Sequence, residues 1–208
     1  LAAAYVLDRN AVVAGDFRID EGGHVRFAVL VKDGLGKRRL GRIVQRLLEI
    51  ETYKCMAMMT LPIARDVFSQ AAQLDAEVSG VVQSMAGHQD QASASLDQLL
   101  AVSAKIEVLS STTSFRFSAG RAYSAIVGQR IAVLREERVM QRQLFSEFML
   151  RRFTPAMRTS EAAEKRLQDL SAQAARASDL LATRVGVAAA EQNRKLLERM
   201  NQRAALQM

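Results

Sequence analysis

The helical architecture follows from residues 167–188, which read LQDLSAQAARASDLLATRVGVA. Small and apolar side chains recur there at alternating steps of three and four residues, the spacing of a coiled-coil seam. The members of this seam are Leu167, Leu170, Ala174, Ala177, Leu181, Arg184 and Ala188. The alanines permit close approach of another helix, and Arg184 is the polar residue in the row. The pattern predicts a long helix that packs against other helices along one face.

The residues around this seam also carry helical signals. Thr154 and Pro155 form a helix start, a capping hydroxyl followed by proline at the first helical position. A helix from Thr154 to Met208 would measure roughly 80 Å at ~1.5 Å per residue. Apolar periodicity predicts a preceding helix over residues 119–152. Residues 110–114, SSTTS, compete for backbone hydrogen bonds, so we expect a kink or a break there.

Further amphipathic helices are expected in the central part of the chain. An apolar stripe with three- and four-residue steps begins at Leu40 and predicts a helix from residue 37 onward. Pro62 should bend or interrupt this helix after Met59, because proline removes a backbone donor and its ring clashes one turn back. Helical patterns resume over residues 64–85 and 92–109, with a turn expected at 87–90.

The first 34 residues have the pattern of β-strands. Runs of β-branched and alternating residues predict strands over residues 4–7, 11–19 and 24–32. Gly22 and Gly23 supply the positive φ angles of a tight reversal, so the last two runs should form a hairpin. Two or three strands bury too little surface to stand alone, and they must pack on a helix or on further strands. We favour further strands, which makes this hairpin the end of a larger sheet domain.

These patterns together predict an α+β fold that is predominantly α. We expect a short antiparallel β-hairpin followed by long antiparallel, coiled-coil-like helices. The expected domains are residues 1–36, the hairpin part of a truncated α/β domain, and residues 37–208, a long-helix bundle or coiled-coil domain. Six of the 11 glycines lie in the first 41 residues, which agrees with this division because glycine disfavours helix interiors.

The positive charge of the chain is localised. The formal net charge is +7, and residues 35–60 hold six basic and two acidic side chains, while residues 121–158 hold eight and three. Such clusters favour an anionic neighbour, which could be nucleic acid, phospholipid headgroups or an acidic protein, and they also fit solvated helix faces. The aromatic residues fall at helical steps that bury them better than they display them for stacking on bases. We therefore expect no nucleic-acid partner.

Two sets of basic residues are candidates for contact with anionic lipid or with a partner protein. The first set, Arg38, Arg39 and Arg42, continues to Arg46 along one edge of the helix expected from residue 37. The second set lies near the C-terminus and consists of Arg194, Lys195, Arg199 and Arg203. In this second set, Arg194 and Lys195 have the spacing to pair with Glu198 and Glu191. The alternative is a juxtamembrane basic stretch that meets anionic lipid.

Residue types with catalytic or metal-binding chemistry are sparse. One cysteine excludes an internal disulfide framework, and His24 and His88 lie too far apart in sequence to suggest a zinc site or an acid–base pair. Cys55 has no histidine near it in sequence, and we expect a buried structural thiol rather than a nucleophile. Gly34 and Gly36 lack the third glycine of a dinucleotide fingerprint. We therefore expect no catalysis, no cofactor and no metal site.

Four segments carry a resemblance to a known family: residues 45–56 (QRLLEIETYKCM), 61–64 (LPIA), 115–123 and 166–181. They are similar to segments of a bacterial family of unknown function described as predicted membrane-anchored proteins. The resemblance covers nearly the whole chain. It implies a preceding α/β region, hydrophobic segments that follow Met208, and a location on the cytoplasmic face of the bacterial inner membrane. It carries over no catalytic residue.

These observations favour a membrane-tethered helical assembly or scaffold module without catalysis, which self-associates through its long helices. The alternative is the cytosolic domain of an ion transporter or channel, because a small α/β part that leads into long helices resembles the cobalt/magnesium transporter architecture. That analogy concerns fold alone, and fold does not imply function. A third class, an enzyme acting on phosphorylated ligands, would need a site supplied by the N-terminal region that the resemblance implies.

Overall fold

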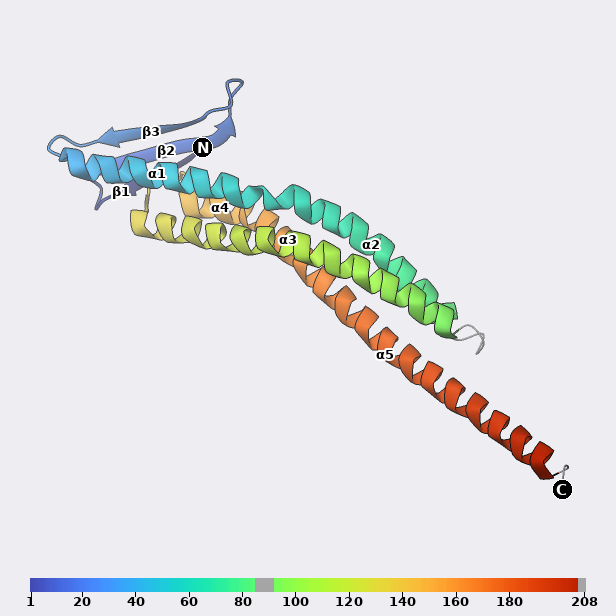
Figure 1. Ribbon diagram of the computed structural model, residues 1–208. Coiled ribbons are helices and arrows are strands. Elements are labelled where there is room, and N and C mark those ends of the chain that lie inside the picture. Colours follow the sequence, from blue (N-terminus) through green and yellow to red (C-terminus); the bar gives the residue numbers. More distant parts are fainter. Residues whose placement is uncertain (85–91, 206–208) are drawn as a thin grey trace. The chain divides into compact units, whose positions relative to one another are not determined.

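The computed structural model describes residues 1–84 and 92–205 (Figure 1). Its elements are β1 (Ala2–Val6), β2 (Ala11–Ile19), β3 (Val25–Val31), α1 (Lys37–Met58), α2 (Thr60–Ser84), α3 (Ala92–Leu134), β4 (Glu137–Arg138), α4 (Phe145–Arg152) and α5 (Thr154–Ala205). The fold is α+β and predominantly helical, which confirms the predicted class. The turn expected at residues 87–90, with His88, lies outside the described residues.

The chain forms two compact units, each built from two segments. The first unit is Leu1–Arg65 with Ser114–Ala162, and the second is Asp66–Thr113 with Ala163–Met208. The boundary expected at residues 36/37 lies inside the first unit, because α1 packs with the strands. Helices α2, α3 and α5 contribute residues to both units.

The first unit contains an antiparallel four-stranded sheet with the order β3-β2-β1-β4. The predicted hairpin is confirmed: Ile19 pairs with Val25 across the reversal, and Gly23 has a φ of +80°. Between Gly15 and Ile19 the register shifts, and Phe17 takes a φ of +54°. Helices of the same chain cover the sheet, which provides the support that the strands require. The expectation of a larger sheet domain stays a prediction.

The continuous helix expected over residues 119–152 is wrong. Helix α3 ends at Leu134, and residues 137 and 138 then pair with β1 through the registers Tyr5↔Glu137 and Ala4↔Arg138. The chain re-enters a helix only at Phe145. A two-residue strand has no periodicity of its own, so this interruption depends on the edge of β1 and not on a local signal.

The core of the first unit lies between the sheet and α1, the C-terminal part of α3, and α4 (Figure 1). Phe17 contacts the rings of Phe27, Phe145 and Phe148, with centroid distances of 5.4, 5.2 and 4.4 Å. A side chain at Gly15 would overlap the ring of Phe27, so glycine is required for this close approach. The aromatic cluster joins the β2–β3 hairpin to α4, two elements far apart in sequence.

The helix interruption predicted near Pro62 is confirmed, and Met59 is the residue between the two helices. Helix α1 ends at Met58 and α2 begins at Thr60, with Pro62 in its first turn, where the missing donor is tolerated. The buried hydroxyl of Thr60 lies 2.8 Å from the hydroxyl of Ser160 on α5 and donates to the carbonyl of Ala57 at 2.8 Å. Gly120 of α3 faces this residue, since a Cβ there would overlap the methyl group of Thr60.

The second unit consists of parts of α2, α3 and α5, and each helix buries one stripe. All three stripes have alternating steps of three and four residues, the coiled-coil spacing. They are Val67, Ala71, Leu74, Val78 and Val81 on α2; Ser95, Leu99, Val102, Ile106 and Leu109 on α3; and Ala163, Leu167, Leu170, Ala174, Ala177 and Leu181 on α5. At the edges of these stripes, Asp75 binds Arg166 and Glu77 binds Lys105, each at 2.8 Å.

Two expectations for these helices are wrong. Helix α3 passes through residues 110–114 without a break, because the hydroxyls of Ser111, Thr112 and Thr113 donate to carbonyls within the helix at 3.0, 2.8 and 2.7 Å. The seam of α5 is buried only as far as Leu181, and its expected members Arg184 and Ala188 are exposed.

Gly120→Ala should lower the free energy of unfolding by about 1–3 kcal/mol, because the new methyl group overlaps that of Thr60 in a packed contact. Thermal or urea unfolding measures the loss. The double variant Gly120→Ala/Thr60→Ser should recover it, since serine keeps the hydroxyl bond and lacks the methyl group.

Gly128→Ala, on the same helix, is the matched control, because nothing lies near a Cβ at that position. It should stabilise the protein by about 0.5–1 kcal/mol through helix propensity alone. Equal stabilisation by Gly120→Ala would show that α2 and α3 do not approach closely there.

Candidate functional site

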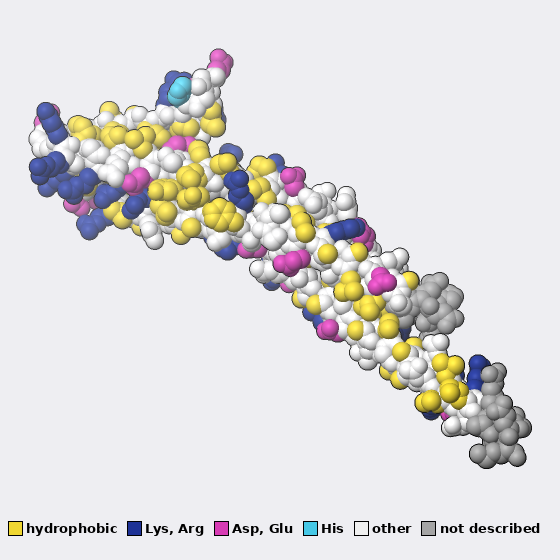
Figure 2. Space-filling view, viewed as in Figure 1, with side chains coloured by type: hydrophobic (Ala, Val, Ile, Leu, Met, Phe, Trp, Pro, Cys, Tyr) yellow, Lys and Arg dark blue, Asp and Glu magenta, His cyan; other side chains and the backbone are white. Residues whose placement is uncertain are grey.

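A highly charged cavity lies beside the turn between β1 and β2. It has a volume of about 270 Å³ and is lined by Leu7, Asp8, Arg39, Arg42, Arg46, Val133, Leu134 and Arg135. All of these residues belong to the first unit. Lysine and arginine side chains gather at the end of this unit where α1 begins (Figure 2). We call this cavity the arginine pocket.

The arginine pocket is assembled from three parts of the chain. Arg39, Arg42 and Arg46 are spaced by three and four residues, so they share one face of α1. Arg135 follows the last residue of α3 and approaches from the other side. The turn after β1 supplies Leu7 and Asp8, and Leu134 of α3 is fully buried beneath the pocket.

The backbone on both sides of the arginine pocket has an unusual conformation. Leu7, Asp8 and Arg9 have φ angles of 52°, 53° and 64°, and Arg135 has a φ of 49°. The left-handed region costs non-glycine residues roughly 1–2 kcal/mol each. Asn10 holds the turn, since its side-chain amide donates to the carbonyl of Leu7 at 2.9 Å. The fold therefore retains strained residues at this place.

The four guanidinium groups of the pocket form no side-chain hydrogen bond or ion pair with any described residue. Other arginines of the same unit do: Arg9 binds Glu137 at 2.6 Å, and Arg130 binds Glu49 at 2.5 Å. Helix α1 also begins without acidic residues in its first turn and without a side-chain cap at Gly36. The positive end of the helix dipole thus adds to the field of the arginines.

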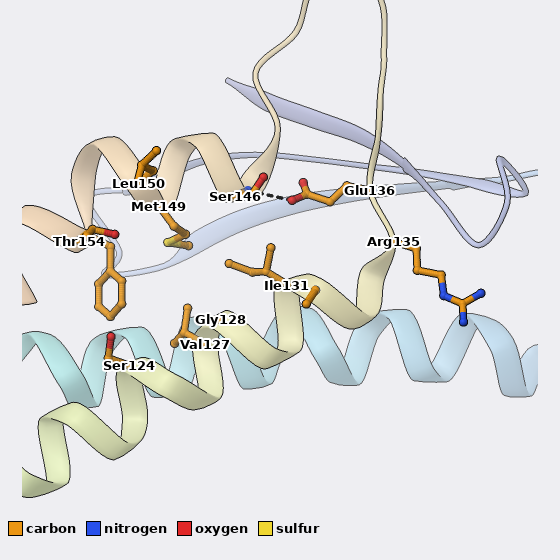
Figure 3. Close-up of a pocket in the computed structure, with 12 residues that line it drawn as sticks. Ser124, Val127, Gly128, Ile131, Arg135, Glu136, Ser146, Met149, Leu150 and Thr154 are labelled. Carbon is orange, nitrogen blue, oxygen red and sulfur yellow. Dashed lines mark hydrogen bonds between the residues drawn. The ribbon is translucent and has the colours of Figure 1, made fainter.

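A second, larger cavity of about 550 Å³ lies between α3 and α4 (Figure 3). Its walls are mostly apolar, with Val127, Ile131 and Met149 among the lining residues. At one end, the carboxylate of Glu136 accepts hydrogen bonds from the backbone N–H groups of Phe145 and Ser146, at 2.7 and 2.9 Å. Glu136 is thereby committed to the N-terminus of α4, and the remaining polar side chains are mainly hydroxyls.

The structure treats the two predicted basic sets differently. Arg39 and Arg42 lie together in the arginine pocket, whereas Arg38 is exposed and outside it. In the C-terminal set, Arg194 lies 3.6 Å from Glu198 and Lys195 lies 3.7 Å from Glu191, as their spacing predicts. Arg199 is exposed, and the side chain of Arg203 lies outside the described residues.

Sequence reasoning missed two parts of the arginine pocket. The spacing of Arg39, Arg42 and Arg46 was visible in the sequence, because residues three and four apart share a helix face. Arg135 had no such signal, because it was expected inside a continuous helix. The turn at Leu7 and Asp8 gave only a weak signal, since aspartate tolerates a left-handed backbone better than most residues but leucine does not.

The remaining candidate residues do not form a reactive cluster. Cys55 is exposed, which corrects the expectation of a buried thiol. Its pKa is raised by partial desolvation and by the carboxylate of Glu51, 3.5 Å away, so the thiolate is disfavoured. Among residues 1–84 and 92–205, no three His, Cys, Asp or Glu residues are grouped to hold a metal ion. No helix in these ranges is long and apolar enough to cross a membrane.

The chain is similar to a known protein family. A family model described as "Protein of unknown function (DUF3422)" matches residues 1–208. No curated protein and no solved structure matches the chain at a significant level.

The pKa of Glu147 should be below the ordinary glutamate value in an NMR titration. Arg138 donates hydrogen bonds to this carboxylate, and the backbone N–H of Leu144 adds one at 3.0 Å. Because the pKa of Glu147 is lower in the folded state, its ionised carboxylate stabilises the fold. This stabilisation is fully present above the pKa of the unfolded state, about 4.3. It is lost as the pH falls through the folded value.

Arg138→Ala should therefore raise the pKa of Glu147, and the stabilities of the two proteins should converge only as the pH falls below the folded pKa of Glu147. Arg142→Ala is the control, because it removes an arginine side chain from the same loop and keeps the carbonyl that Arg138 also contacts. An unchanged pKa of Glu147 in Arg138→Ala would contradict the assignment.

Proposed function

The chain belongs to the family of proteins of unknown function that its full length matches, and we propose that it acts as a helical assembly module of a membrane-anchored protein. In this proposal it works on the cytoplasmic face of the bacterial inner membrane, has no catalysis of its own, and self-associates through α5. The membrane anchor and the location rest on the sequence resemblance. Self-association rests on a structural observation, the exposed apolar stripe of α5 beyond Leu181.

This stripe continues α5 past the last buried residue of the second unit. None of residues 182–202 is buried, and Val185 alone among them is half-buried. Leu196 and Met200 are 49% and 66% exposed. Five apolar residues of this segment fall within an arc of about 60° around the helix axis, since successive residues are rotated by about 100°. They are Ala182, Val185, Ala189, Leu196 and Met200. We call these five residues the overhang stripe; it has the composition of a helix face that packs against another helix.

The positions of the overhang stripe favour a second copy of the same helix as its partner. Val185 and Met200 lie equally far from the point between Gln192 and Asn193, and so do Ala189 and Leu196. A second copy that runs antiparallel about this point places Val185 opposite Met200 and Ala189 opposite Leu196, as a twofold interface requires.

The charges of this segment support a protein partner over a lipid surface. Residues 182–202 hold four cations and two carboxylates, and Arg194 and Lys195 already lie within 4.0 Å of carboxylates on their own helix. The two carboxylates reduce the net charge of this segment from +4 to +2, which weakens its attraction to an anionic membrane. Contact of Arg194, Lys195, Arg199 and Arg203 with anionic lipid is the competing prediction, and binding to vesicles that contain phosphatidylglycerol tests it.

Leu196→Asp should weaken self-association strongly. Each buried leucine contributes ~1.5 kcal/mol or more, and a symmetric dimer contains the change twice, so the dissociation constant should rise by roughly 100-fold. Sedimentation equilibrium measures it over a range of concentrations. Val187→Asp is the matched control, because Val187 is 63% exposed and lies on the opposite side of α5. It should leave association unchanged.

Cysteine cross-linking in a Cys55→Ser background tests the direction of the helices. Val185→Cys together with Met200→Cys should form an intermolecular disulfide, and Val185→Cys alone should not, because only an antiparallel pair brings positions 185 and 200 together. A monomeric wild-type chain at high concentration, or equal losses in Leu196→Asp and Val187→Asp, would refute self-association through the overhang stripe.

A further inference from the structure

The geometry points to a binding site for a phosphate group in the arginine pocket, a site separate from the overhang stripe. Four guanidinium groups share a cavity of about 270 Å³ with a single carboxylate, that of Asp8. Like charges held in one cavity repel, and an anion that enters it relieves the repulsion. The proposed ligand is a small molecule or headgroup with a terminal phosphate monoester or a diphosphate.

The sharing of one cavity separates these arginines from an ordinary basic surface. Some arginines of the first unit bind carboxylates, as Arg9, Arg26 and Arg130 do, whereas others form no ion pair with a described residue. Arg39, Arg42, Arg46 and Arg135 contact no carboxylate among the described residues, although Asp8 lines the same cavity. Their donors are therefore available together to a group that comes from outside the chain.

The charges at the ends of α1 and α4 also favour an anion near the N-terminus of α1. Helix α4 has Glu147 in its first turn and Arg151 and Arg152 in its last, which matches the helix dipole. Helix α1 has the opposite arrangement, with Arg39 of the pocket in its first turn and no acidic residue there. This arrangement disfavours the isolated helix and becomes favourable when an anion lies near its N-terminal end.

The chemistry and the size of the cavity select a phosphate. Planar guanidinium groups donate paired hydrogen bonds that match the oxygens of a phosphate, and several of them can share two or more negative charges. The volume is below the range of roughly 300–1,000 Å³ that holds drug-sized ligands, so a compact group fits. Leu7, Val133 and Leu134 supply an apolar wall for a short carbon stem.

The strained backbone supports a functional origin. Leu7 and Asp8 on one side and Arg135 on the other take left-handed φ angles, and all three line the cavity. Strained residues of this kind concentrate where function requires a fixed position. Arg135 is placed by this conformation immediately after α3, opposite the arginines of α1.

Two sources could present the phosphate, a soluble metabolite or a lipid headgroup, and two arms of one experiment distinguish them. The first arm titrates inorganic pyrophosphate into the chain by calorimetry at constant ionic strength. The second arm measures co-sedimentation with vesicles of phosphatidylcholine that contain phosphatidic acid. We expect saturable binding in at least one arm, and the arm that binds identifies the source.

Arg42→Gln and Arg135→Asn should each weaken that binding by at least about tenfold, because each removes a charged donor from the pocket. Both residues are exposed, so the fold should be retained, and circular dichroism checks it. Arg38→Gln is the matched control, since it removes one charge from the same turn of α1 outside the pocket. It should change the affinity by less than about twofold.

Equal losses in Arg38→Gln and Arg42→Gln would overturn the proposal, because they would indicate a diffuse electrostatic attraction. An absence of saturable binding in both arms would overturn it as well. Neither result bears on self-association, which sedimentation of the same variants measures separately.

Discussion

The burial of three matching stripes is the constraint on which the helical part depends. Helices α2, α3 and α5 each present small and apolar side chains at alternating steps of three and four residues, and each stripe can be removed from water only by the other two. Alanines at 71, 163, 174 and 177 allow the helices to approach closely. The ion pairs Asp75–Arg166 and Glu77–Lys105 lie at the edge of this contact and add direction rather than much energy.

The same constraint explains what remains exposed. The stripe of α5 is buried as far as Leu181, and from residue 182 to residue 202 the helix has apolar side chains without a partner among the described residues. In the first unit the exposed feature is electrostatic. Arg39, Arg42, Arg46 and Arg135 share a cavity, and no carboxylate among the described residues binds them. The apolar stripe of α5 is able to pack against another helix, and the arginine pocket is able to bind an anion. The chain therefore presents two surfaces of different chemistry.

The elements that were predictable are those with strong local signals. The hairpin at Gly22 and Gly23, the helix boundary near Pro62 and the start of α5 at Thr154 all follow from residues that restrict their own backbone. The errors fall where a local tendency competes with context. Residues 110–114 stay helical because their hydroxyls bond back to the carbonyls of the same helix. Residues 137 and 138 leave the helical pattern because the edge of β1 accepts them as a strand.

The sequence by itself determined the class of the fold, the long helices, the coiled-coil seam as far as Leu181 and the spacing of the basic residues, because periodicity and charge spacing are properties of the chain. Only the tertiary structure decided which arginines share a cavity and where the seam of α5 loses its partners. Arg39 and Arg135 are separated by 96 positions, and no local pattern relates them. They meet because α1 and the end of α3 bury their apolar faces against the same sheet.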